Sequence, residues 1–118
     1  MKIGDTFVIG EGGHLWIVIS DPAKHSSRFV IANLTTDANR AGTDCELNRG
    51  DHQWIREVCY INFGDAREVT PIEEARISEC IEDGRICKHF PMKSAVLQRI
   101  ICAAKKSKAL PTGLRKYF

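Results

Sequence analysis

Residues 12–22 read GGHLWIVISDP: two glycines and a histidine lead into an apolar run that Asp21-Pro22 closes. Branched and aromatic side chains in such a run, bounded by turn residues, predict a buried β-strand over residues 15–20. The glycines of residues 10–13 predict a tight hairpin connection to an earlier strand, because glycine adopts positive φ without steric cost. A titratable side chain, His14, therefore stands at the entrance to a core strand.

Similar apolar runs lie on both sides of this strand. We expect further strands over residues 6–9, 29–35, 45–47 and 58–63, with a short closing strand over 67–69. Short strands separated by Gly, Asp and Pro turns are typical of a small, strongly bent barrel. A chain of 118 residues that is 43% hydrophobic can build one core, so we expect a single domain.

The sequence changes character at Thr70. In Thr70-Pro71-Ile72-Glu73, a hydroxyl stands at the N-cap, proline occupies the first helical position, and glutamate completes a capping box. This pattern predicts a helix that runs to about residue 83, where Gly84 ends it.

A second helix is predicted over residues 93–108, after a short connection at 85–88, because apolar residues recur at helical spacing. Residues 112–118 either stay loose or form one further turn. The expected architecture is one domain, residues 1–118, that is mainly β with C-terminal α. Its barrel covers residues 1–70, and two helices with a basic tail cover 71–118.

The β half contains four segments in a recognisable order: GDTFVIG, HLWIVISDP, FVIANLTT and VCYINFGDAREV. This order, over about residues 3 to 70, resembles the MazF/PemK-like toxin family. The resemblance implies an SH3-like barrel with a C-terminal helix, usually a homodimer. It also implies a metal-independent endoribonuclease without a cofactor, neutralised by an antitoxin peptide.

Members of that family commonly carry an arginine before the second strand, acting with a hydroxyl residue at the end of the third. The hydroxyl position matches Thr35 or Thr36, whereas His14 stands where the arginine is expected. The chain therefore resembles a divergent member of the family. Such a member is either a nuclease or a barrel of the same shape that has a different function.

The residues themselves allow RNA cleavage by acid/base chemistry. Attack by an internal 2′-hydroxyl needs a base, an acid and donors for the phosphorane charge, and histidine suits either proton-transfer role near neutral pH. If strands 15–20 and 29–35 pair antiparallel, His14 lies beside Thr35 and Thr36, which would position the phosphate. His52, on a Gly-Asp turn, is the candidate second proton carrier.

Charge is divided along the chain. Residues 1–83 hold all 15 acidic residues and 8 of the 17 Lys and Arg, whereas residues 84–118 hold the other 9 bases and no acid. The basic segment either docks on the acidic body or binds a polyanion such as RNA. The candidate RNA-binding residues are Lys24, Arg49, Arg56, Arg99, Lys105 and Lys106.

The expected location is the cytoplasm, with no membrane partner. No apolar run approaches the roughly 20 residues of a membrane span, and no signal peptide is recognised. An odd set of five cysteines without CxxC spacing favours reduced thiols over a disulfide framework.

Two alternatives to the nuclease stay open. One is a non-catalytic SH3-like barrel that binds nucleic acid or a partner protein. The other is a zinc-stabilised structural domain that uses Cys45, His52 and Cys59, although their seven-residue spacing is not the usual spacing of zinc ligands.

Overall fold

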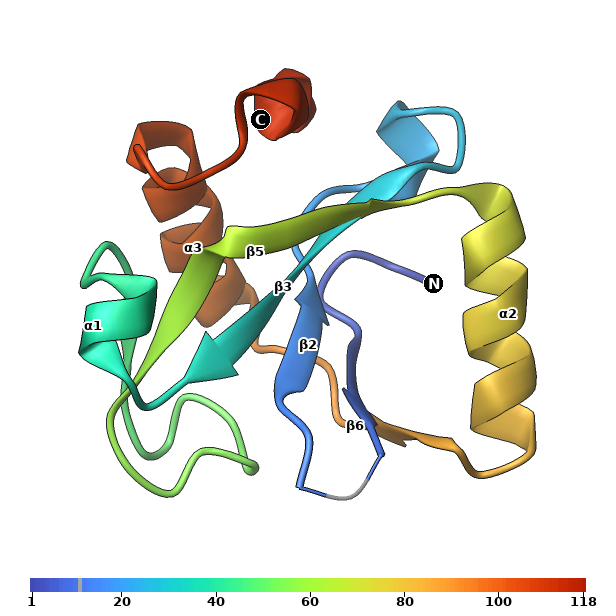
Figure 1. Cartoon of the computed structure of the whole chain (residues 1–118), viewed down its shortest axis with the longest axis horizontal. Coiled ribbons are helices and arrows are strands. Elements are labelled where there is room, and N and C mark those ends of the chain that lie inside the picture. The colour runs from blue at the N-terminus through green and yellow to red at the C-terminus, as the bar shows by residue number, and fades with distance from the viewer. Residues whose placement is uncertain (11) are drawn as a thin grey trace.

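The computed structural model describes residues 1–10 and 12–118, and these form one six-stranded antiparallel sheet (Figure 1). The strands are β1 (Thr6–Ile9), β2 (Leu15–Val18), β3 (Phe29–Thr35), β4 (Glu46–Leu47), β5 (Cys59–Val69) and β6 (Ile86–His89). Their order across the sheet is β4-β5-β3-β2-β1-β6. Within the described residues β4 and β6 do not pair, so the strongly bent sheet is open between these two edge strands and forms a half-barrel.

Helices lie against both faces of this sheet (Figure 1). They are α1 (Ala38–Ala41), α2 (Pro71–Glu82) and α3 (Ser94–Lys106), with 3-10 turns η1 (Pro22–Lys24) and η2 (Thr112–Tyr117). The apolar stripe of α3, which includes Val96 and Ile100, joins the larger core cluster. On α2, Ile77 and Ile81 pack against a second cluster around Phe7. The alternating side chains of the strands thus supply two apolar faces, each with its own helix.

The strand predictions hold closely where the apolar runs are continuous. The bounds of β1 and β3 match the sequence expectation, and β2 is shorter by two residues. The separate closing strand over 67–69 is wrong, because residues 59–69 form one strand whose register against β3 shifts between Ile31 and Asn33. The predicted connection at 10–13 includes residue 11, which lies outside the described residues.

The connection expected at 85–88 is a strand instead. Residues 86–89 of β6 pair antiparallel with β1, with Thr6 opposite His89 and Val8 opposite Cys87. Only Ile86 of this segment is buried, and Lys88 and Cys87 are exposed, so the local sequence has little strand signal. The free edge of β1 creates the strand by offering backbone hydrogen-bond partners.

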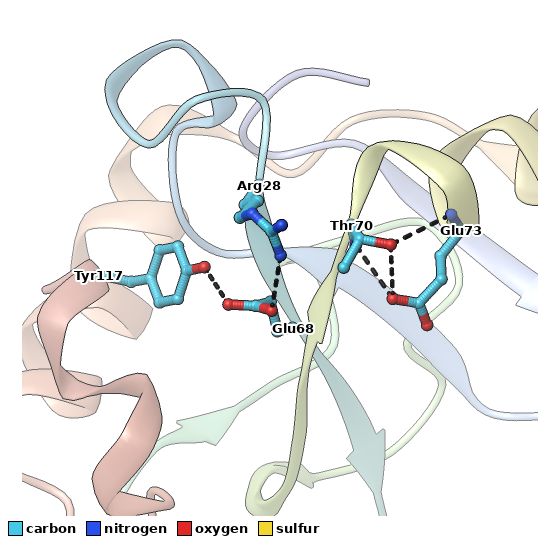
Figure 2. A network of polar contacts seen from close by, with 5 residues as sticks. All are labelled: Arg28, Glu68, Thr70, Glu73 and Tyr117. Carbon is cyan, nitrogen blue, oxygen red and sulfur yellow. Dashed lines mark hydrogen bonds and ion pairs between the residues drawn. The ribbon is translucent and has the colours of Figure 1, made fainter.

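The start of α2 carries the expected capping box, seen in Figure 2. The Glu73 N–H donates to Thr70 Oγ1 at 3.3 Å, and the Thr70 N–H donates to Glu73 Oε1 at 3.1 Å. Gly84, with a φ of +84°, follows the end of the helix in the conformation that favours glycine.

The C-terminal residues are docked and form the further turn η2. The Tyr117 hydroxyl donates to the Glu68 carboxylate, which also pairs with Arg28 at 3.2 Å (Figure 2). Burial and this hydrogen bond to Glu68 raise the pKa of Tyr117 to about 12. The end of the chain is thereby held against β5 and the start of β3.

Candidate functional site

His14 lies at the point where the β2–β3 ladder ends. The last paired residues there are Trp16 and Asn33, and continuing the same register by two residues would bring His14 opposite Thr35. The His14 Nδ1 atom donates to the backbone carbonyl of Leu34 at 2.9 Å. The structure therefore places His14 against the end of the third strand, as the antiparallel pairing predicts.

This hydrogen bond selects one tautomer of the neutral imidazole. A carbonyl oxygen only accepts, so Nδ1 carries the proton and Nε2 keeps its lone pair. The residue is exposed, and Nε2 has no hydrogen-bond partner among residues 1–10 and 12–118. His14 thus presents an oriented, accessible base at the end of the β2–β3 ladder.

The two threonines beside it differ in availability. Thr35 is 7% exposed, and its hydroxyl accepts from the Asp37 N–H at 3.2 Å in the turn that begins α1. Thr36 is exposed and lines a neighbouring pocket. Thr36 is therefore the hydroxyl that a ligand reaches first, and Thr35 helps to shape the strand end.

The pocket has a volume of about 560 Å³. Its lining combines apolar and polar side chains: Thr36, Gln53, Trp54, Ile55, Arg56, Glu57, Cys59 and His89. Ile55 and Cys59 are buried and form an apolar base, whereas Arg56 and Glu57 are exposed at its rim. We call this cavity the Thr36 pocket.

A second hollow of about 360 Å³ shares Gln53, Ile55 and Arg56 with the Thr36 pocket. It continues along the loop between β4 and β5 and adds Arg49 and Lys93 to the lining. The two hollows together form one groove, named here the loop groove. Its basic lining residues are Arg49, Arg56 and Lys93, with Glu57 as the single acid among the described residues.

His52 holds this loop in place rather than serving as a free acid or base. His52 is 5% exposed. Its Nε2 donates to the Phe90 carbonyl at 2.6 Å, and its Nδ1 accepts from the backbone N–H of Trp54 at 3.0 Å. Both ring nitrogens are occupied, so the structure does not support the predicted second proton carrier. The sequence around a histidine on a Gly-Asp turn gives no signal of this burial, which depends on Phe90, directly after β6, lying beside the loop.

Contacts from the basic C-terminal segment fix the same loop. Arg99, a predicted RNA-binding residue, is paired with Asp51 at 3.3 Å and donates to the Glu46 carbonyl at 3.1 Å. Lys93 Nζ donates to the Gly50 carbonyl at 2.8 Å. Burial alone would raise the pKa of Asp51, but the Asn48 N–H and the Arg99 guanidinium lower it below its ordinary value. Part of the basic segment thus docks on the acidic body, and Arg99 is engaged within the protein.

The other predicted RNA-binding residues do not share one surface. Arg49 and Arg56 line the loop groove. Lys24 and Lys105 line a separate hollow of about 210 Å³ with His25, Tyr117 and Phe118. Lys106 is exposed on α3 and lines neither. Of the predicted RNA-binding residues, only Arg56 therefore lines the Thr36 pocket, and Arg49 lines the adjoining hollow.

The zinc alternative finds no assembled ligand set. Burial raises the pKa of both Cys45 and Cys59 to about 11, so these thiols stay protonated, and both nitrogens of His52 are hydrogen-bonded. No group of three or more His, Cys, Asp or Glu with metal-binding geometry is found in residues 1–10 and 12–118.

Sequence reasoning missed Gln53, Glu57 and His89 as lining residues. The segment Gln53-Trp54-Ile55-Arg56 carries a usable signal, since two large apolar residues between polar ones indicate a loop anchored to a core. His89 carries none, because its position depends on the pairing of β6 with β1.

The fold and site together define a class: a small protein with a curled antiparallel sheet, helices on both faces, and a largely basic groove at one end. The chain matches no protein-family model, and a search of curated proteins gives no match. Within the residues the structure describes, no helix has the length and apolarity that crossing a membrane requires.

Proposed function

We propose that this protein is an endoribonuclease toxin of the MazF/PemK type, built on an SH3-like barrel, that cleaves single-stranded RNA without a metal. The observation that carries the proposal is the His14 imidazole, which the Leu34 carbonyl holds near the end of β3, where Thr36 follows the strand. A base at the end of the strand that Thr36 follows, together with a Thr36 hydroxyl that lines a largely basic groove, supplies the parts that transesterification requires.

The proposed reaction begins with His14 Nε2 taking the proton of a ribose 2′-hydroxyl. The 2′-oxygen then attacks the adjacent phosphorus, while the Thr36 hydroxyl donates to a phosphoryl oxygen as negative charge develops. The bond from phosphorus to the 5′-oxygen breaks, the leaving oxygen takes a proton from solvent, and His14 releases its proton to solvent. The products are a 2′,3′-cyclic phosphate and a 5′-hydroxyl end, and the charges balance without a cofactor.

The biological setting of the proposal rests on the resemblance in the β half of the sequence. A toxin of this kind acts in the cytoplasm, is neutralised by an antitoxin protein and is usually a homodimer. A neighbouring gene for a small antitoxin-like protein would support this part of the proposal.

The test is incubation of the pure protein with a long unstructured RNA in EDTA, followed by mapping of the product ends. We expect 2′,3′-cyclic phosphate ends, and His14→Gln lowers the cleavage rate by about 10²–10⁴-fold, the usual contribution of a positioned acid or base. The matched control is His25→Gln, because His25 lies in the separate hollow near Tyr117. Intact RNA, or cleavage by His14→Gln at the wild-type rate, would refute the proposal.

A second candidate function is nucleic-acid binding without cleavage. The lining of the loop groove favours it, since Arg49, Arg56 and Lys93 outnumber Glu57. RNA that binds with strong salt dependence and stays intact would favour this alternative over the nuclease.

A further inference from the structure

We infer that the Thr36 pocket binds one nucleotide of an unpaired strand, with its base against Trp54 and its phosphate between Arg56 and His89. The inference deepens the proposed function, on which it rests for the identity of the strand, by assigning a subsite separate from His14. It uses residues that come from three parts of the chain: the end of β3, the loop before β5 and the end of β6.

The size and composition of the pocket fit a flat ring. Its volume of about 560 Å³ lies within the range of small-molecule sites. Trp54 is half-buried and packs against the main core, which leaves part of its indole to line the pocket. Ile55 and Cys59 complete an apolar surface, and aromatic side chains in such positions stack on bases without requiring one particular base.

The polar rim fits the rest of a nucleotide. Arg56 and His89 come from different elements, and neither side chain has a hydrogen bond or ion pair to another residue within the described part of the chain. An arginine without an internal partner is suited to bind phosphate oxygens in bidentate geometry. Gln53 and Glu57 offer acceptors for the amino or imino groups of a base.

The wall that carries Trp54 is already fixed before any ligand binds. The backbone N–H of Trp54 donates to His52 Nδ1, and His52 Nε2 donates to the Phe90 carbonyl. Lys93 and the Arg99–Asp51 pair hold the preceding turn. A preformed wall reduces the conformational entropy that is lost on binding. We therefore expect a single nucleotide to bind tightly enough for its affinity to be measured.

The test is calorimetric titration of the full chain with each of the four nucleoside 5′-monophosphates, with the matching nucleoside and inorganic phosphate as separate arms. We expect at least one nucleotide to bind more tightly than either fragment. Arg56→Gln and His89→Gln each raise its Kd by about tenfold or more, the effect of losing a charge-assisted hydrogen bond. The matched control is Arg76→Gln on α2, an exposed arginine that does not line the pocket, and it leaves the Kd unchanged.

Three results would overturn the inference: no saturable nucleotide binding, inorganic phosphate binding as tightly as the nucleotide, or equal Kd values for wild type and both pocket variants. Circular dichroism of each variant establishes that it is folded. Because the readout is binding, the two proposals fail separately. Nucleotide binding without RNA cleavage refutes the nuclease and keeps the pocket, whereas His14-dependent cleavage without nucleotide binding refutes the pocket and keeps the nuclease.

Discussion

The ion pair between Asp51 and Arg99 is predicted to stabilise the protein in a pH-dependent way. Asp51→Asn keeps the shape of the side chain and one acceptor oxygen, but it removes the charge that faces Arg99 at 3.3 Å. The Asp51 carboxylate also accepts from the Asn48 N–H at 2.7 Å. The substitution therefore measures how much the negative charge of Asp51 contributes to stability, with little change in packing.

The expected magnitude follows from these two contacts. Partly exposed ion pairs contribute up to about 1 kcal/mol, and a backbone hydrogen bond loses part of its strength when a neutral amide replaces a carboxylate. We expect the free energy of unfolding of Asp51→Asn to be about 1–1.5 kcal/mol lower than that of wild type at neutral pH.

The pH dependence gives the sharper test. The pKa of Asp51 is lowered in the folded protein, so its contribution to stability is present above its unfolded-state pKa of about 3.9. That contribution is lost as the pH falls through the lowered folded-state pKa, because both states then bind the proton. The stability curves of wild type and Asp51→Asn should therefore converge in acid.

The assay is urea denaturation followed by circular dichroism at neutral pH and at an acidic pH below the unfolded-state pKa of about 3.9, where the Asp51 contribution to stability is being lost. A double-mutant cycle with Arg99→Met isolates the coupling between the two side chains. An equal loss of stability at both pH values would refute the electrostatic reasoning. So would a coupling free energy of zero at neutral pH.

Two further predictions concern the α2 cap and the cysteines. Thr70→Ala removes the acceptor of the Glu73 N–H and should lower the free energy of unfolding by about 1 kcal/mol, measured by thermal denaturation; an unchanged Tm would contradict the capping argument. At pH 8, iodoacetamide should modify the exposed Cys87 and Cys102 first, because burial raises the pKa of Cys45 and Cys59 to about 11. Mass spectrometry of the native protein checks this order. Modification of Cys59 as early as Cys87 would contradict the argument that burial protects its thiol.

The sequence by itself determined the elements whose signals are local. The bounds of β1 and β3 follow from continuous apolar runs, and the start of α2 follows from a capping box contained within four residues. The approach of His14 to the end of β3 was also predictable, because antiparallel pairing of two clear strands leaves little choice of register.

Only the tertiary structure decided what depends on distant partners. Residues 86–89 are a strand because β1 has a free edge, and His52 is buried because its loop lies against residue 90. The groove likewise gathers Thr36, Arg56 and His89 from separate elements. Such features depend on backbone pairing and burial between segments that are far apart in the chain. The pattern of apolar residues within a short stretch of sequence does not predict them.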